Sequence, residues 1–233
     1  MSGPGAIACI GGGGFLADDQ RGLQERFLLT LIAAERRRER PRVLYLGLAH
    51  GDAESRQLRA YRMFARLGCD LTTLPFFPYE MKRDYAAEAL AADLVYVGGG
   101  NTPAMVAVWR EFGFDRALHA AWQSGVMLAG VSAGANCWFG HYVTDSVPGG
   151  GVRAGLGWLP GTFCPHLDSE PWRAPVLAGV ADAPAYGVRE GGMMVLRPGV
   201  APEFVADRPG VTANVRLPGE AAREVPSLDL SSR

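Results

Sequence analysis

Short apolar runs alternate with longer segments in which apolar residues recur at helical spacing through the first half of the chain. The apolar runs predict strands at 6–10, 43–48, 69–74, 94–97 and 126–129. The periodic segments predict helices at 20–38, 54–67, 85–92, 103–110 and 115–123. This alternation predicts an α/β fold with a mostly parallel, doubly wound sheet and helices on both faces.

The second half of the chain has a different pattern. Residues 147–161 are rich in Gly and Pro and predict a long, largely irregular loop, and whether this loop acts as a lid is left open. Short apolar runs predict a small antiparallel C-terminal extension at 185–188, 193–196, 203–205 and 211–215. The polar segment 218–233 predicts a loosely held tail. Since no repeat or linker is visible, we expect one domain over 1–233.

Composition excludes several classes of partner. A net charge of −1 and a pI of about 6.4 argue against a nucleic-acid partner, which normally requires a basic stripe. No run of about 18 apolar residues predicts a membrane span, and no signal peptide is visible at the N-terminus. The 4 cysteines are scattered without a CxxC pair, which is typical of reduced thiols and predicts a cytoplasmic protein. A homodimer is left open.

The segment Gly130–Gly134 reads Gly-Val-Ser-Ala-Gly and matches the G-x-S-x-G pattern of a nucleophile elbow. It follows a predicted buried strand and opens a helix that is expected to continue through Phe139. The two glycines suit a strand-to-helix turn too tight for side chains, which leaves Ser132 at its tip. A plain Gly/Ser turn is the alternative. With both flanking elements legible, the pattern favours Ser132 as a nucleophile.

A serine hydroxyl needs a general base, and the chain has 4 histidines. His166 follows Pro165 in a polar segment and is the first candidate. His50 follows the second strand, at the edge where open α/β sheets bind ligands, and stays open. His119 falls within a predicted helix and His141 lies beyond the elbow helix, so both favour structural roles.

The base needs an orienting acid, for which three residues are candidates. Asp168 is close enough to His166 to be only a local turn-former, and Asp145 suits an Asx turn. Glu190 lies in a glycine-flanked corner between two predicted strands, where an acid is well placed to accept an imidazole N–H.

Glycine-rich segments follow two predicted strands. After the strand at 94–97, the amides of Gly99 or Gly100, together with that of Ala133, are candidates for a two-donor oxyanion hole. The first strand precedes Gly12–Ala17, which fits the dinucleotide pattern G-x-G-x-x-A, but the second strand does not end in the acidic residue that a ribose requires. A tight turn is the better interpretation of 12–17, so no cofactor is expected. No metal is expected either, because no ligand spacing such as HExxH occurs.

Together these segments resemble the peptidase E (aspartyl dipeptidase) family, which includes cyanophycinase. The resemblance covers most of residues 6–200 and rests on four segments in the family's order, namely 97–102, Gly130–Asn136, 159–166 and 186–191. It implies a fold like class I glutamine amidotransferases, with serine in place of cysteine at the elbow. It also implies a Ser-His-Glu triad of Ser132, His166 and Glu190.

The sequence therefore predicts a cytoplasmic serine peptidase that acts on short peptides, dipeptidase-like, with an acidic N-terminal residue as a candidate preference. Arg173 and Arg189 are candidates for binding a substrate carboxylate, and an ordinary surface arginine is the alternative for each. Asn101 is a further substrate-binding candidate. The alternatives are another acyl hydrolase, such as an esterase or a cyanophycinase-like enzyme, and a non-catalytic binding protein on the same scaffold.

Overall fold

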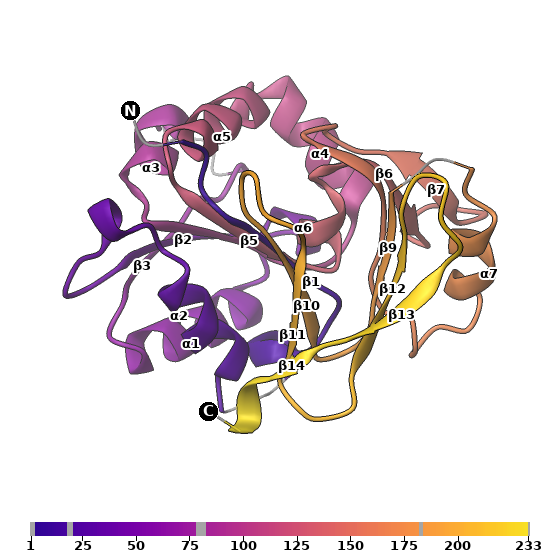
Figure 1. Ribbon diagram of the computed structural model, residues 1–233. Helices are drawn as coiled ribbons and strands as arrows, with labels where there is room; N and C mark the ends of the chain where they lie inside the picture. Colours follow the sequence, from indigo (N-terminus) through magenta and orange to yellow (C-terminus); the bar gives the residue numbers. More distant parts are fainter. Residues whose placement is uncertain (1–2, 18–20, 78–82, 182–183, 233) are drawn as a thin grey trace.

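The computed structural model describes residues 3–17, 21–77, 83–181 and 184–232, whose strands form two mixed sheets (Figure 1). In spatial order, the first sheet contains β14 (Leu228–Asp229), β11 (Glu203–Ala206), β10 (Gly192–Leu196), β1 (Ile7–Ile10), β5 (Met127–Val131), β4 (Leu94–Val97), β2 (Arg42–Leu46) and β3 (Asp70–Thr73). Strands β1 to β5 are parallel to one another, whereas β10 is antiparallel to both β1 and β11.

The second sheet is built from the later part of the chain. In spatial order it contains β13 (Arg223–Pro226), β12 (Thr212–Arg216), β9 (Ala185–Val188), β8 (Leu159–Cys164), β6 (Phe139–Thr144) and β7 (Gly151–Ala154). Its central strands β6, β8 and β9 are parallel, and the outer pairs are antiparallel. The prediction of an α/β fold is therefore confirmed, but the single mostly parallel sheet with a small extension is corrected to two mixed sheets.

Helices cover both faces of the first sheet, as predicted (Figure 1). One face packs against α1 (Leu23–Thr30) and α2 (Glu54–Arg66), where Ala60, Met63 and Phe64 recur at helical spacing and are buried. The other face packs against α3 (Tyr85–Ala91), α4 (Thr102–Glu111) and α5 (Phe114–Gln123). The apolar residues of this second face continue into the second sheet, so the two sheets share one hydrophobic cluster.

Several predicted segments differ from the structure. The predicted helix at 20–38 is limited to α1 and a 3₁₀ turn at Ala34–Arg36, and residue 20 lies outside the described residues. The helix after Ser132 is the short α6 (Ala133–Asn136), because the chain then turns into β6. Residues 147–161, expected to be an irregular loop, contribute β7 and the start of β8. Likewise, the expected loose tail 218–233 pairs through β13 and β14 with both sheets.

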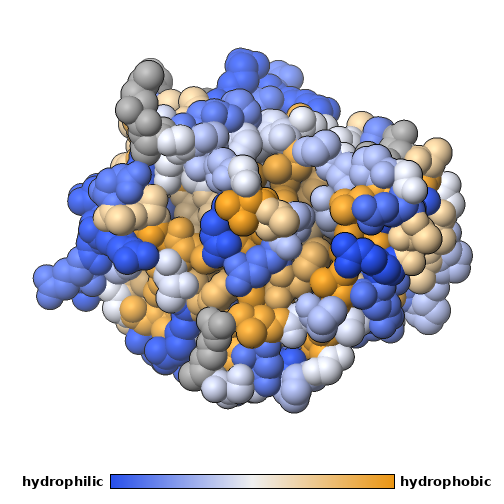
Figure 2. Space-filling model, in the orientation of Figure 1, coloured by the Kyte–Doolittle hydropathy of each residue, from blue (hydrophilic) through white to orange (hydrophobic). Residues whose placement is uncertain are grey.

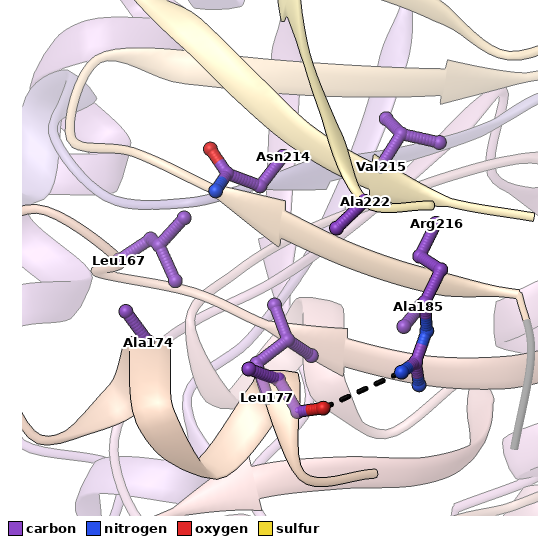
Figure 3. A pocket seen from close by; sticks show the side chains of 9 residues that line it. Leu167, Ala174, Leu177, Ala185, Asn214, Val215, Arg216 and Ala222 are labelled. Atoms are coloured by element: carbon purple, nitrogen blue, oxygen red, sulfur yellow. Dashed lines mark hydrogen bonds between the residues drawn. The ribbon is translucent and has the colours of Figure 1, made fainter. Parts of the chain in front are cut away.

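Hydrophilic residues lie around much of the face shown in Figure 2, and hydrophobic ones gather nearer its middle. A largely apolar cavity of about 200 Å³ lies between β9, β12 and α7 (Arg173–Ala178), with Leu167, Leu177 and Ala185 in its lining (Figure 3). None of the helices that the structure describes has the length and apolar content needed to span a bilayer.

Candidate active site

Ser132 lies at the turn between β5 and α6, near the middle of the first sheet. Its backbone has φ 54° and ψ −110°, a conformation that residues with a side chain rarely adopt. The turn is tight: a Cβ atom at Gly130 would lie 2.2 Å from the carbonyl oxygen of Gly134. The Ser132 amide donates to the carbonyl of Ile10 on the neighbouring strand, at 3.0 Å. These contacts hold the strained turn at the carboxyl edge of the sheet.

Ser132, His166 and Glu190 contact one another in series, although they are distant along the chain. Ser132 Oγ lies 2.9 Å from His166 Nε2. His166 Nδ1 forms a short hydrogen bond with Glu190 Oε1. The structure thus brings together the three side chains that the sequence nominates as nucleophile, base and acid, at hydrogen-bonding distance.

Two short segments hold His166 and Glu190 against each other. His166 follows the end of β8 with a positive φ of 55°, and its amide donates to the carbonyl of Gly11 at 3.1 Å. The Glu190 amide, in the corner between β9 and β10, donates to Asp168 Oδ1 at 2.9 Å. Ser169 Oγ donates to Glu190 Oε1 at 3.3 Å. Asp168 therefore acts as a local support for the acid.

Gly12 forms the wall behind this acid. A Cβ atom at this position would lie 2.1 Å from Glu190 Oε2, so any side chain would displace the carboxylate. The sequence shows Gly12 only as part of a glycine-rich turn, and nothing in its pattern links this turn to residue 190. The interpretation of 12–17 as a tight turn agrees with the observed geometry.

The hydrogen bond from His166 is the main reason why the pKa of Glu190 lies below its ordinary value, and burial opposes this effect. Glu190 is therefore a carboxylate at neutral pH and can stabilise positive charge on the imidazole.

A cavity of about 300 Å³ opens at the Ser132 side chain. Gly99 and Gly100 line it, and a Cβ atom at Gly99 would lie 3.3 Å from the Ser132 Cβ. Ala133 is buried directly after the serine. Among the described residues, no backbone carbonyl accepts a hydrogen bond from the Gly99, Gly100 or Ala133 amide outside regular helices and strands. Of the three residues, Gly99 and Gly100 are in the cavity lining and Ala133 is not, and the oxyanion hole stays a prediction.

The remaining three histidines form no hydrogen bond with Ser132 among the contacts that the structure describes. His50 lines the same cavity, but its Nε2 lies 2.8 Å from the Tyr45 hydroxyl. Burial, and then the charge of Arg56, lower the pKa of His50. The His119 ring packs edge-on against Trp122 and Trp158, and His141 lies on β6.

The three predicted substrate-binding side chains are already occupied by the protein itself. Asn101 caps α4 by accepting from the Ala104 amide at 2.9 Å, and its Nδ2 donates to the carbonyl of Ser146. Arg173 is 3% exposed and binds Glu170, Asp145 and the carbonyl of Val143. Arg189 donates to the carbonyl of Thr212 and to Glu224. None of the three lines the Ser132 cavity in the part of the chain that the structure describes.

Arg56, which the sequence analysis did not single out, does line this cavity. It lies in the first turn of α2, after the strand whose carboxyl end carries His50. Its position after a parallel strand was the available signal. That signal is weak, because α2 carries several arginines and only the structure shows which one faces the cavity. Among the described residues, no group of three or more His, Cys, Asp or Glu side chains is arranged to hold a metal ion.

Comparison with known proteins identifies the family. The family model of peptidase family S51 matches residues 9–200. The uncharacterized peptidase YgaJ of Bacillus subtilis (strain 168) is 38% identical over 169 residues, which cover 72% of this chain and 71% of that protein. The chain belongs to peptidase family S51. As a member of this serine peptidase family, the protein is a hydrolase of peptide bonds.

Two solved structures have the same fold as this S51 peptidase. A peptidase from an acI-B1 Actinobacterium superposes with a TM-score of 0.76 at 21% identity, over 97% of this chain and 95% of that one. A putative peptidase E protein from Listeria monocytogenes EGD-e superposes with a TM-score of 0.64 at 13% identity, over 87% of this chain and 98% of that one. At these identities the likeness establishes the fold alone.

Proposed function

We propose that this S51 peptidase hydrolyses short peptides, dipeptidase-like, with Ser132, His166 and Glu190 as its catalytic triad. One observation carries the proposal: Ser132 Oγ lies 2.9 Å from one His166 ring nitrogen, while Glu190 accepts from the other. This serial contact supplies a weak nucleophile with a base and an orienting acid. A cavity of about 300 Å³ suits a short peptide better than a folded chain.

In the acylation step, Ser132 Oγ attacks the carbonyl carbon of the scissile bond and its proton passes to His166 Nε2. Glu190 stabilises the resulting imidazolium through the Nδ1 hydrogen bond. The negative oxygen of the tetrahedral intermediate accepts from the Ala133 amide and from that of Gly99 or Gly100. When the C–N bond breaks, His166 returns the proton to the leaving amine.

Deacylation repeats these steps with water. His166 Nε2 takes a proton from the water molecule, whose oxygen attacks the acyl carbon. The bond to Ser132 Oγ breaks, and the serine oxygen receives the proton from His166. The resemblance to the peptidase E family suggests an acidic N-terminal residue as the preferred substrate.

The first test is Ser132→Ala, assayed with a panel of dipeptides, isopeptides and aryl esters. We expect peptide hydrolysis to fall by roughly 10⁴-fold or more, with the fold intact by circular dichroism. A fluorophosphonate should label the native protein and not the variant. Ser124→Ala, at the end of α5 and the amino edge of the sheet, is the matched control and should keep full activity.

Retained peptide hydrolysis by Ser132→Ala would rule out the proposed nucleophile. Turnover of aryl esters alone would favour an esterase, and turnover of isopeptides alone would favour a cyanophycinase-like enzyme.

A further inference from the structure

Arg56 supplies a positive charge at the wall of the Ser132 cavity. It is exposed, lies in the first turn of α2 and lines the cavity together with Ser132 and His50. Within the described ranges, no carboxylate forms an ion pair with it. The cavity therefore presents a guanidinium group whose hydrogen-bonding fork is open to a ligand.

The neighbours of Arg56 show where its charge acts. Its charge lowers the pKa of His50, after the larger effect of burial, so the two groups lie close together and His50 stays neutral. The Tyr45 hydroxyl lies 2.8 Å from His50 Nε2. This wall thus carries the Arg56 guanidinium beside the polar side chains of His50 and Tyr45, with the Asp52 carboxyl group next to them. The guanidinium is the group of this wall that favours a bound anion.

The order of the strands places Arg56 on the opposite side of Ser132 from His166. Strand β5, which leads to the serine, lies between β1 and β4. On the β1 side, Gly11 and Gly12 contact His166 and Glu190. On the other side, β4 leads to the glycine turn at 98–100, and β2 leads to His50 and then to α2.

This arrangement determines which part of a substrate meets Arg56. The leaving amine must lie beside His166, because it takes its proton from Nε2. The acyl residue then extends toward the opposite wall, past the oxyanion donors at 99–100. We propose that Arg56 is the specificity-determining residue of the site and binds a carboxylate carried by the acyl residue of the substrate. This inference rests on the proposed function for the direction of the peptide.

Such a carboxylate has two chemical sources. It is the side chain of an aspartate in an ordinary α-linked dipeptide, or the α-carboxylate of an aspartate linked through its β-carbonyl. Both place one carboxylate near the scissile carbonyl, and both suit the bidentate fork of an arginine. The peptides Asp-Leu and β-Asp-Leu separate these sources, with Asn-Leu as the neutral reference.

The kinetic test compares the native protein with Arg56→Met and Arg56→Lys. We expect native kcat/KM to be higher for Asp-Leu or β-Asp-Leu than for Asn-Leu. Arg56→Met should lower that preference by about 10- to 100-fold, the range typical of a hydrogen-bonded charge, because the acidic peptide loses far more kcat/KM than Asn-Leu does. Arg56→Lys should restore part of the preference, because lysine keeps the charge but not the fork. Arg62→Met, a change at an exposed arginine of the same helix outside the cavity lining, is the control.

A binding test separates this inference from the proposed function. Calorimetry on Ser132→Ala measures the dissociation constants of the same peptides without turnover. We expect the preferred acidic peptide to bind about 10-fold or more tightly than Asn-Leu, and Ser132→Ala/Arg56→Met to bind both alike.

The outcomes are distinct. An Arg56-dependent preference in binding, without hydrolysis by the native protein, would support the inference and refute the proposed function. A preference for neither acidic peptide would overturn the inference, as would an equal loss on Asn-Leu in Arg56→Met.

Discussion

Backbone strain in this protein gathers at the residues around Ser132. In the described part of the chain, the non-glycine residues with positive φ are Asp52, Ser132 and His166. Two of them contact each other at the site, and the third follows His50, which lines the same cavity. Such conformations cost roughly 1–3 kcal/mol each and persist where the surroundings hold them in place. For Ser132 and His166, which contact each other, this strain is consistent with the proposed catalytic role.

Acid sensitivity at the residue scale tests the pairing of Glu190 with His166. The hydrogen bond from His166 holds the pKa of Glu190 below its usual range, so the folded protein keeps this carboxylate charged to a lower pH than the unfolded chain does. This contribution to stability is present above the ordinary glutamate pKa of about 4.3 and is lost as pH falls through the lowered folded-state value. The free energy of unfolding of the native protein should fall between about pH 6 and pH 3. In Glu190→Gln this fall should be smaller by about 1 kcal/mol, measured by urea titration at both pH values.

Glu39→Gln is the control for this measurement, because Glu39 is exposed and precedes the amino end of β2, away from the site. If the free energy of unfolding of Glu190→Gln falls with decreasing pH as steeply as that of the native protein, the pairing of Glu190 with His166 is contradicted.

The residues of the site differ in how readily the sequence alone identifies them. Ser132 is visible because its glycines, strand and helix all follow one local pattern. His166 and Glu190 are harder to identify, since their polar loops allow several histidines and acids, and the resemblance to a known family singled them out. Arg56 was missed because its place in the cavity lining depends on which face of α2 meets the cavity. Arg173 and Arg189 were only candidates for substrate binding, and the partners that the structure gives them lie too far along the chain to be seen in the sequence.

At the scale of elements, Arg173 joins three parts of the molecule. Its guanidinium, with 4% side-chain exposure, binds Glu170 in the segment after His166, Asp145 after β6, and the carbonyl of Val143 within β6. The first turn of α7 is thereby fixed to the strand and to the segment that carries the base. The Arg173 side chain therefore stabilises the segments around the site and does not line the cavity.

Removing this arginine should therefore affect stability more than selectivity. We expect Arg173→Met to lower the free energy of unfolding by about 2 kcal/mol, below the cost of breaking a fully buried pair because Asp145 is largely exposed. Urea unfolding measures this loss, with the exposed Arg153→Met as control. The ratio of kcat/KM for Asp-Leu to that for Asn-Leu should stay unchanged. If Arg173→Met keeps the native stability but loses the preference for Asp-Leu over Asn-Leu, Arg173 binds the substrate instead.

The elements that the sequence predicted well are those with a long local pattern, such as α2, whose bounds differ from the prediction by one residue. In the second sheet, β9 and β12 were predicted as strands of the C-terminal extension, but β6 and β8 were missed because they lack such patterns. β8 reads Leu-Pro-Gly-Thr-Phe-Cys, in which Pro and Gly argue against a strand. β6 follows α6 so closely that its apolar residues continue the helical pattern. Both strands depend on pairing with each other and with β9, which no local window contains.

At the scale of the whole molecule, the hydrophobic clusters together bury every cysteine. Cys9, Cys69, Cys137 and Cys164 are buried free thiols. Burial raises the pKa of Cys69 to about 11 and that of Cys164 to about 12, and it also raises those of Cys9 and Cys137. The thiolate is the reactive form, so the folded protein should resist thiol reagents.

We expect the native protein at about pH 8 to react with Ellman's reagent far more slowly than the protein unfolded in guanidinium chloride, in which all 4 thiols should titrate at once. Peptide hydrolysis should survive the reagent, because the proposed nucleophile is an oxygen. Rapid labelling of the native chain with loss of activity would contradict both the burial and the proposed chemistry.

The contact between Gly12 and Glu190 has a consequence for the chain during its synthesis. The serine leaves the ribosome well before the histidine, and the glutamate that packs against the first glycine turn follows last of the three. If the proposed function is correct, a nascent chain that ends before residue 190 carries an unactivated hydroxyl and cannot cleave the peptides around it. The enzyme would become active only when the two distant ends of its site meet.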